Sequence, residues 1–267
     1  MTIKLVALDL DGTVLVDWHT VTDGVQAAVK RASAQGAKVV LATGREYPGA
    51  TTFYKLLGLT TPVVCFQGAL VYDPQTDTTL VENGLTQELT EQVITLGREK
   101  GLAVYIYGRF ATYVENGSEM GNELLGGIGT PLTHVPDLEQ ILDFAPLKII
   151  IIHPAEDVPA LMAELRQRLD SRAVTVTRSL DVAIEMVAPV VSKGTAVAAV
   201  AAHYGIAQQE TMAVGDQDND VEMLEWAAVS VAMGNGSPLA KAAADVVAPS
   251  KHEDGVVWAI EQYVLQS

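Results

Sequence analysis

The chain has 267 residues, 49% of them hydrophobic, which is enough for one large or two modest folded domains and excludes a disordered chain. Its 33 acidic and 17 basic side chains leave a net charge of −16, so a polyanion such as nucleic acid is not an expected partner. The single cysteine, Cys65, excludes an internal disulfide and fits a reducing compartment.

The first residues enter an apolar segment too early to leave room for a signal peptide. The longest apolar runs, such as 149–152, fall well short of the roughly 18 residues that a membrane helix needs. We therefore expect a cytoplasmic protein with no membrane association. The sequence leaves its oligomeric state open.

Short apolar segments alternate with helical patterns from the N-terminus onward, which is typical of a parallel sheet covered by helices. Strands are predicted at 5–8, 39–42 and 63–66, with a helix at 25–34. Near the C-terminus, an alanine-rich helix at 195–203 precedes strands at 212–214 and 229–232. Segments that are apolar on both faces suit the central strands of a parallel sheet.

The middle of the chain has a different pattern. A β-hairpin is predicted from 103–107 to 110–115 around Gly108-Arg109, and further strands at 147–152, 174–177 and 182–187. Two helices are predicted at 89–100 and 158–169, with Thr86 or Thr90 capping the first and Asp157 the second. Because strand-rich α+β material interrupts an α/β pattern, we expect one domain formed by 1–83 and 187–267, with a second, 84–186, inserted into it.

Polar side chains follow the predicted parallel strands at their carboxyl ends, where open parallel sheets bind ligands. They fall in four groups: Asp9 and Asp11; Thr43, Gly44 and Arg45; Lys193; and Asp216, Asp218, Asn219 and Asp220. Carboxylates that share one crevice repel one another, and a divalent cation relieves this repulsion. A set of oxygen donors without histidine or cysteine favours Mg²⁺ over zinc.

Lys193, Arg45 and a helix N-terminus could hold a phosphate inside this acidic protein. Asp9 and Asp11 lie on the same side if the strand still runs through both. One carboxylate can then attack phosphorus, and the other can protonate the departing alkoxide and later activate water. Each group alone is typical of a turn, a cap or a solvated lysine, and only the joint arrangement favours catalysis.

The sequence resembles the haloacid dehalogenase superfamily and, within it, the Cof-type phosphatases. The resemblance is carried by four segments in order, 8–13 (LDLDGT), 42–45 (ATGR), 192–194 (SKG) and 215–220 (GDQDND), with closing segments at 231–236 and 253–256. It implies a Rossmann-like parallel-sheet core with an inserted α+β cap domain that sets substrate specificity.

The resemblance also implies roles for single residues. Asp9 would be the nucleophile and a Mg²⁺ ligand, and Asp11 the general acid/base that offers its backbone carbonyl to the metal. The other implied roles are phosphate binding by Thr43, Gly44, Lys193 and Asn219, metal binding by Asp216, and support by Arg45 and by Asp220, which would orient Lys193 or a metal-bound water. Gln67 and Lys251 depart from the family, which usually carries asparagine at both places, and either change could alter contacts or be neutral.

The expected function is Mg²⁺-dependent hydrolysis of a small phosphorylated metabolite, expected to be a sugar phosphate, through an aspartyl-phosphate on Asp9. A phosphomutase would use the same residues to pass the phosphoryl group to another hydroxyl, and nothing in the motifs excludes it. A non-catalytic binding protein is disfavoured because no motif residue is missing. The superfamily's ion pumps carry threonine at the position of Asp11 and so lack an acid that could protonate an alkoxide. The aspartate of this chain therefore favours a phosphatase over an ion pump.

Overall fold

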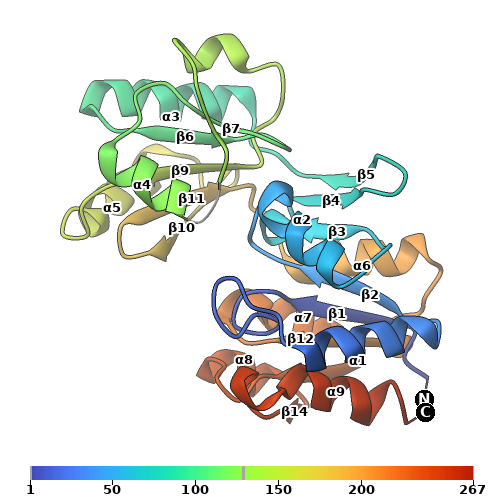
Figure 1. Cartoon of the computed structure of the whole chain (residues 1–267). Coiled ribbons are helices and arrows are strands. Elements are labelled where there is room, and N and C mark those ends of the chain that lie inside the picture. The colour runs from blue at the N-terminus through green and yellow to red at the C-terminus, as the bar shows by residue number, and fades with distance from the viewer. Residues whose placement is uncertain (1, 128–129, 267) are drawn as a thin grey trace. The chain divides into compact units, whose positions relative to one another are not determined.

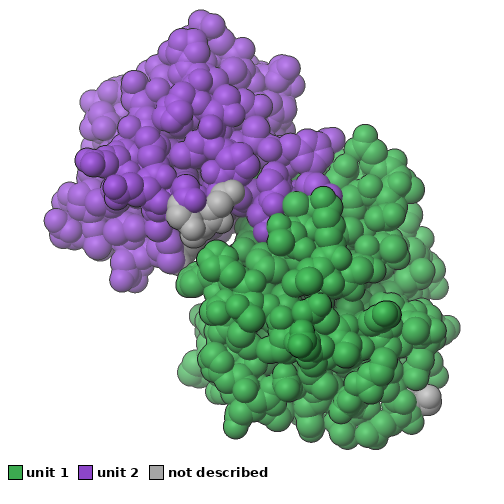
Figure 2. Space-filling view, in the orientation of Figure 1, with its two compact units in different colours: residues 1–45, 50–81, 192–267 green, residues 46–49, 82–191 purple. Residues whose placement is uncertain are grey.

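The computed structural model describes residues 2–127 and 130–266. The chain divides into two compact units, unit 1 (1–45, 50–81 and 192–267) and unit 2 (46–49 and 82–191), coloured separately in Figure 2. The segment 84–186 that the sequence assigns to an insertion lies within unit 2. In the described part of the chain, no helix is both long and apolar enough to span a bilayer.

Unit 1 is built on a sheet with strand order β14-β13-β12-β1-β2-β3-β4-β5 (Figure 1). Its strands are β1 (Leu5–Asp9), β2 (Lys38–Ala42), β3 (Val63–Cys65), β4 (Leu70–Asp73), β5 (Thr78–Glu82), β12 (Thr211–Gly215), β13 (Val229–Ala232) and β14 (Val246–Val247). Pairing is parallel from β14 across to β3, and β4 runs antiparallel to β3. All five residues of β1 are buried, as expected for a central strand covered on both faces.

The helices around this sheet are α1 (Asp23–Ala34), α2 (Tyr47–Leu56), α6 (Lys193–His203), α7 (Val221–Trp226), α8 (Pro238–Ala243) and α9 (Gly255–Tyr263). Helix α1 begins where the Thr22 hydroxyl accepts a hydrogen bond from the N–H of Val25, and it buries a stripe formed by Val25, Ala28, Val29 and Ala32. Residues of α6, α7 and α8 share one apolar cluster with β1, β2 and β12. The sheet thus has the helical cover that the alternating sequence pattern predicts.

Unit 2 has a sheet with strand order β10-β11-β9-β6-β7-β8. Its elements are α3 (Gln87–Lys100), β6 (Val104–Tyr107), β7 (Thr112–Val114), α4 (Glu119–Gly127), β8 (Leu132–His134), β9 (Lys148–Ile152), α5 (Val158–Arg168), β10 (Thr175–Leu180) and β11 (Ala183–Val187). Antiparallel pairing of β6 with β7 confirms the predicted hairpin, whereas β7 and β8 pair in parallel. Helices α3 and α5 share an apolar core with the strands.

Two local expectations need adjustment, at β3 and at the start of α5, and one of the two alternatives for the α3 cap is confirmed. Strand β3 ends at Cys65, one residue early, because Phe66 turns into the left-handed region with φ 52°. Thr86 rather than Thr90 caps α3, accepting a hydrogen bond from Leu89 N–H. Asp157 precedes α5 but its carboxylate makes no capping hydrogen bond, and it lies 3.4 Å from His153 Nε2 instead. Asp157 therefore occupies the predicted N-cap position of α5, but its side chain does not cap the helix.

Candidate active site

The predicted site residues come from strand ends, loops and helix starts at one edge of the unit 1 sheet. Because β1 pairs in parallel with both β2 and β12, the carboxyl ends of these strands meet at that edge. Asp9 is the last residue of β1, Thr43 follows β2, and Asp216 follows β12. Lys193 is the first residue of α6, whose N-cap is Ser192.

Lys193 joins two carboxylates that are far apart in the sequence. Its ammonium nitrogen lies 2.5 Å from Asp9 Oδ1 and 2.6 Å from Asp220 Oδ1, and its side chain is 1% exposed. Burial lowers the pKa of Lys193, but the charges of Asp220 and Asp9 outweigh burial and leave that pKa raised. Lys193 therefore stays cationic, and it fixes one oxygen of Asp9.

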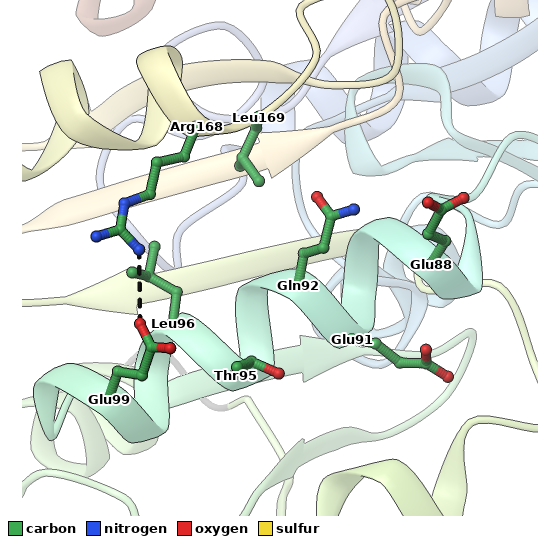
Figure 3. Close-up of a pocket in the computed structure, with 8 residues that line it drawn as sticks. All are labelled: Glu88, Glu91, Gln92, Thr95, Leu96, Glu99, Arg168 and Leu169. Carbon is green, nitrogen blue, oxygen red and sulfur yellow. Dashed lines mark ion pairs between the residues drawn. The ribbon is translucent and has the colours of Figure 1, made fainter.

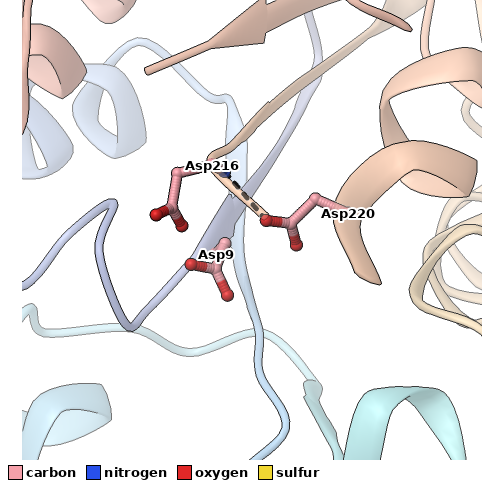
Figure 4. A group of neighbouring side chains, drawn as sticks. All are labelled: Asp9, Asp216 and Asp220. Atoms are coloured by element: carbon pink, nitrogen blue, oxygen red, sulfur yellow. Dashed lines mark hydrogen bonds between the residues drawn. The ribbon is translucent and has the colours of Figure 1, made fainter. Parts of the chain in front are cut away.

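A third carboxylate, Asp216, completes a buried acidic cluster with Asp9 and Asp220 (Figure 4). One oxygen of each lies within 4.8 Å of the others. Burial raises the pKa of Asp9 well above its usual range, the charges of Asp220 and Asp216 raise it further, and Lys193 opposes them. Burial likewise raises the pKa of Asp216, against hydrogen bonds from Gln217 and Thr13. Three carboxylates thus face one buried ammonium group.

The residues of the cluster fit a bound Mg²⁺. Asp9 Oδ2 is buried and has no hydrogen-bond partner among the described residues, so it offers a free lone pair at the place where negative charge accumulates. Both oxygens of Asp220, in contrast, are already used, by Lys193 and by the backbone N–H groups of Asp216 and Gln217. An oxygen-only donor set of this kind suits Mg²⁺.

The loop around Gly12 is shaped to admit the Asp216 carboxylate. Gly12 has φ +91°, and a Cβ at this position would lie 2.3 Å from Asp216 Oδ2. The Asn235 amide donates to Gly12 carbonyl oxygen at 2.9 Å, and Thr13 donates to Asp216 Oδ1 at 3.3 Å. The backbone N–H of Lys251 donates to Asn235 Oδ1. Because any residue except proline supplies this N–H, the contact does not depend on whether lysine or asparagine stands at position 251.

Asp11 does not share the environment of Asp9. β1 has ended before it, and the Arg45 guanidinium grips its two oxygens, with Nη2 2.5 Å from Oδ1 and Nε 2.9 Å from Oδ2. Arg45 also stacks on the Phe53 ring at 5.1 Å and donates from Nη2 to the carbonyl oxygen of Trp18. The carboxylate of Asp11 is therefore oriented by a fixed cation.

Thr43, Gly44 and Asn219 are linked to one another through Gln67 and the turn that carries it. Gln67 N–H donates to the Thr43 carbonyl at 3.0 Å, and the Gln67 side chain lies so close to Gly44 that a Cβ there would be 2.3 Å from Nε2. Gln67 Oε1 accepts a hydrogen bond of 2.8 Å from Asn219. Since Phe66 and Gln67 both have positive φ, the chain holds a strained turn at this place.

Thr13 and Asn235 have no role in the predictions from sequence, although both lie within the motif segments, and Gln67 enters those predictions only as a departure from the family. Their contacts are to backbone carbonyls or to other motif residues, which spacing along the sequence does not reveal. Two features of the sequence could have pointed to these residues. Gly236 follows Asn235, and Gln67 stands where the family usually carries asparagine. The predicted residues fall into three contacting groups: Asp9, Lys193, Asp216 and Asp220; Asp11 and Arg45; and Thr43, Gly44 and Asn219 around Gln67.

A separate hollow of about 500 Å³ lies on unit 2 between α3 and α5 (Figure 3). It is lined by Glu88, Glu91, Gln92, Thr95, Leu96, Glu99, Arg168 and Leu169. Arg168 pairs with Glu99 at 3.5 Å. None of the predicted site residues lines this hollow, so the candidate chemistry stays with the cluster of unit 1.

Comparison with known proteins bears on this geometry. The family model of haloacid dehalogenase-like hydrolases matches residues 6–260. The chain is 30% identical to the 5-amino-6-(5-phospho-D-ribitylamino)uracil phosphatase YitU of Bacillus subtilis, over 97% of each chain, and 26% identical to the pyridoxal phosphate phosphatase YbhA of Escherichia coli, over 99% of this chain and 100% of that one. A haloacid dehalogenase-like hydrolase crystal structure from Bacteroides thetaiotaomicron superposes with TM-score 0.90 at 25% identity, covering 98% of this chain and 99% of that chain. The predicted family, fold class and enzyme class are thus confirmed, and the chain belongs to the haloacid dehalogenase-like hydrolases as a phosphatase.

Proposed function

We propose that this phosphatase hydrolyses small phosphate monoesters through an aspartyl-phosphate on Asp9, with Mg²⁺ as cofactor. The observation that carries the proposal is the state of the Asp9 carboxylate, which Lys193 fixes through one oxygen while the other is buried and unpartnered among the described residues. Asp9, Asp216 and the main-chain carbonyl of Asp11 would hold the ion. When bound, Mg²⁺ neutralises negative charge on the transferring phosphoryl group.

The first half of the reaction forms a bond from an Asp9 oxygen to phosphorus and breaks the bond from phosphorus to the ester oxygen. Asp11, as the carboxylic acid, gives its proton to the departing alkoxide, so that an alcohol leaves. Lys193 keeps the attacking carboxylate in position and adds positive charge beside it.

In the second half Asp11 is a carboxylate and takes a proton from water, whose oxygen forms a new bond to phosphorus. The bond from Asp9 to phosphorus breaks, inorganic phosphate leaves, and both aspartates return to their initial state. Thr43, Gly44 and Asn219 are proposed to contact the phosphoryl oxygens, with Gln67 holding the Asn219 amide in place.

The relatives named above act, by their names, on a phosphoribitylamino-uracil and on pyridoxal phosphate. Both names describe small phosphorylated molecules, which supports a substrate of the same size here. A sugar phosphate remains the prediction from the sequence, to be decided by assay.

The test is phosphate release from a panel of phosphorylated metabolites with Mg²⁺, comparing the parent, Asp9→Asn and Asp23→Asn, an exposed aspartate of α1 that serves as the control. We expect Asp9→Asn to fall to background and Asp23→Asn to keep parental turnover, with a phosphoryl group trapped on the Asp9 peptide of the parent by mass spectrometry. Normal turnover in Asp9→Asn refutes the covalent route. Substrate consumption without stoichiometric free phosphate indicates a phosphomutase instead.

A further inference from the structure

A large aromatic side chain stands exposed next to the catalytic edge of unit 1. Trp18, in the loop between β1 and α1, is 62% exposed. Single exposed apolar residues are common on protein surfaces, so exposure alone assigns nothing. The hydrogen bonds of the backbone around Trp18 are what relate this side chain to the site.

The loop tip that carries Trp18 is tightly ordered by its own hydrogen bonds. Val16 N–H donates to the Thr20 carbonyl at 3.1 Å, which closes the turn. The Asp17 carboxylate accepts from the N–H groups of His19 and Thr20 at 2.7 Å each, and from the Thr20 hydroxyl at 3.0 Å. The indole is therefore held out from a preorganised turn, and the neighbouring carboxylate of Asp17 is engaged by the turn itself.

This turn is attached to the proposed general acid. Arg45 Nη2 donates to the Trp18 carbonyl at 3.1 Å and, from the same nitrogen, to Asp11 Oδ1 at 2.5 Å. The Trp18 backbone therefore lies within two hydrogen bonds of the carboxyl that must reach the leaving-group oxygen. The backbone that carries the exposed indole is therefore tied to the group that would protonate the leaving alcohol.

The phosphoryl end and the alcohol part of the substrate would then contact different kinds of side chain. Charged groups such as Lys193 and Asp9 are arranged for the phosphoryl end. Trp18 offers a large flat face to the alcohol part, and aromatic rings prefer to stack, offset, on other flat rings. We propose that Trp18 is a specificity residue that stacks on a planar ring in the alcohol part of the phosphate ester. This inference rests on the proposed phosphatase function and narrows its substrate class.

A matched pair of substrates tests the stacking. Benzyl phosphate and cyclohexylmethyl phosphate have the same carbon skeleton and both release an alkoxide, but only the first has a flat ring. We expect the parent to favour benzyl phosphate in kcat/KM by about two- to tenfold. The ratio should fall to about one in Trp18→Ala and stay intermediate in Trp18→Phe, while Leu239→Ala, at an exposed position of α8, keeps the parental ratio. These side-chain changes leave the Trp18 carbonyl available to Arg45.

A binding measurement covers the case in which turnover is slow. Titrating the Asp9→Asn variant with benzyl phosphate should quench indole fluorescence, and adding Trp18→Phe to that variant should remove the quenching. A parental ratio in Trp18→Ala, or quenching that persists without Trp18, overturns the proposal. Turnover of both esters without any preference in the parent overturns the stacking while the phosphatase function stands. If neither ester is turned over, absence of quenching in the titration overturns the stacking, and the panel of phosphorylated metabolites decides the phosphatase function separately.

Discussion

Replacing Lys193 by methionine tests whether the buried ammonium group holds the acidic cluster together. Methionine keeps much of the length and volume of lysine but removes the charge, so Asp9 and Asp220 lose the cation at 2.5 and 2.6 Å. Removing one partner of a buried ion pair costs roughly 3–5 kcal/mol, because the remaining charges stay desolvated. At roughly 2–4 °C per kcal/mol, the thermal midpoint should fall by on the order of 6–20 °C.

The assay is thermal unfolding in EDTA, since a bound cation would mask part of the loss. Lys4→Met is the matched control: Lys4 also has a carboxylate oxygen at 2.5 Å, from Glu210, but its side chain is 54% exposed and water screens the pair. We expect Lys4→Met to unfold close to the parent. Equal thermal midpoints for the two variants would refute the reasoning that burial makes the ion pairs of Lys193 contribute more to stability than the exposed pair of Lys4.

The pH dependence of Lys193→Met follows from the same cluster. A carboxyl whose pKa is raised by folding binds more protons in the folded state, so its contribution to stability is full at low pH and is lost as pH rises through the folded-state pKa. Burial already raises the pKa of Asp9 and Asp216, and loss of the ammonium removes the influence that opposes this. The deficit of the variant should therefore be larger at pH 8 than at pH 5, and a deficit that shrinks with rising pH contradicts the assignment.

Three further outcomes are expected. Arg45→Lys should lower kcat by about 10- to 100-fold with little change in the thermal midpoint, because a point charge cannot grip both oxygens of Asp11; steady-state kinetics checks it, and an unchanged kcat contradicts it. Gln67→Gly should raise KM through the loss of the Asn219 hydrogen bond without lowering the midpoint, since glycine relieves the positive φ; a parental KM assigns Gln67 no part in binding. Mg²⁺ at about 100 times its Kd should stabilise the folded protein by roughly 2.7 kcal/mol, and by less in Asp9→Asn, as read from thermal midpoints with and without EDTA.

The sequence was informative where chemistry follows from strand ends. Asp9, Thr43 and Asp216 were placed correctly at one edge because parallel strands bring their carboxyl ends together, and the apolar segments predicted those strands. The contact of Lys193 with two carboxylates follows from position as well, since it begins a helix beside the same edge.

What could not be predicted depends on backbone geometry. The apolar pattern extends β3 through Phe66, but the chain needs a left-handed turn there so that the N–H groups of Phe66 and Gln67 can reach the carbonyls of Arg45 and Thr43. Strand propensity alone cannot predict this turn, because the hydrogen bonds that the turn makes at the site outweigh the preference of Phe66 for a strand. The role of Lys251 is equally invisible, because its main-chain N–H rather than its side chain makes the contact with Asn235.

The grip of Arg45 on Asp11 has a consequence for the proposed reaction. A fork of two donors suits an ionised carboxylate, whereas a protonated carboxyl oxygen is itself a donor and a poorer acceptor. At least one of the three hydrogen bonds from Arg45 to Asp11 must therefore weaken when Asp11 carries the proton that it gives to the leaving group in the proposed reaction. The Arg45 nitrogen that donates to Asp11 Oδ1 also donates to the Trp18 carbonyl. A change in its hydrogen bond to Asp11 therefore acts on a nitrogen that also contacts the loop tip. In the proposed reaction, one guanidinium nitrogen thus contacts both the carboxyl that would protonate the leaving group and the backbone of the residue proposed to stack on the alcohol part.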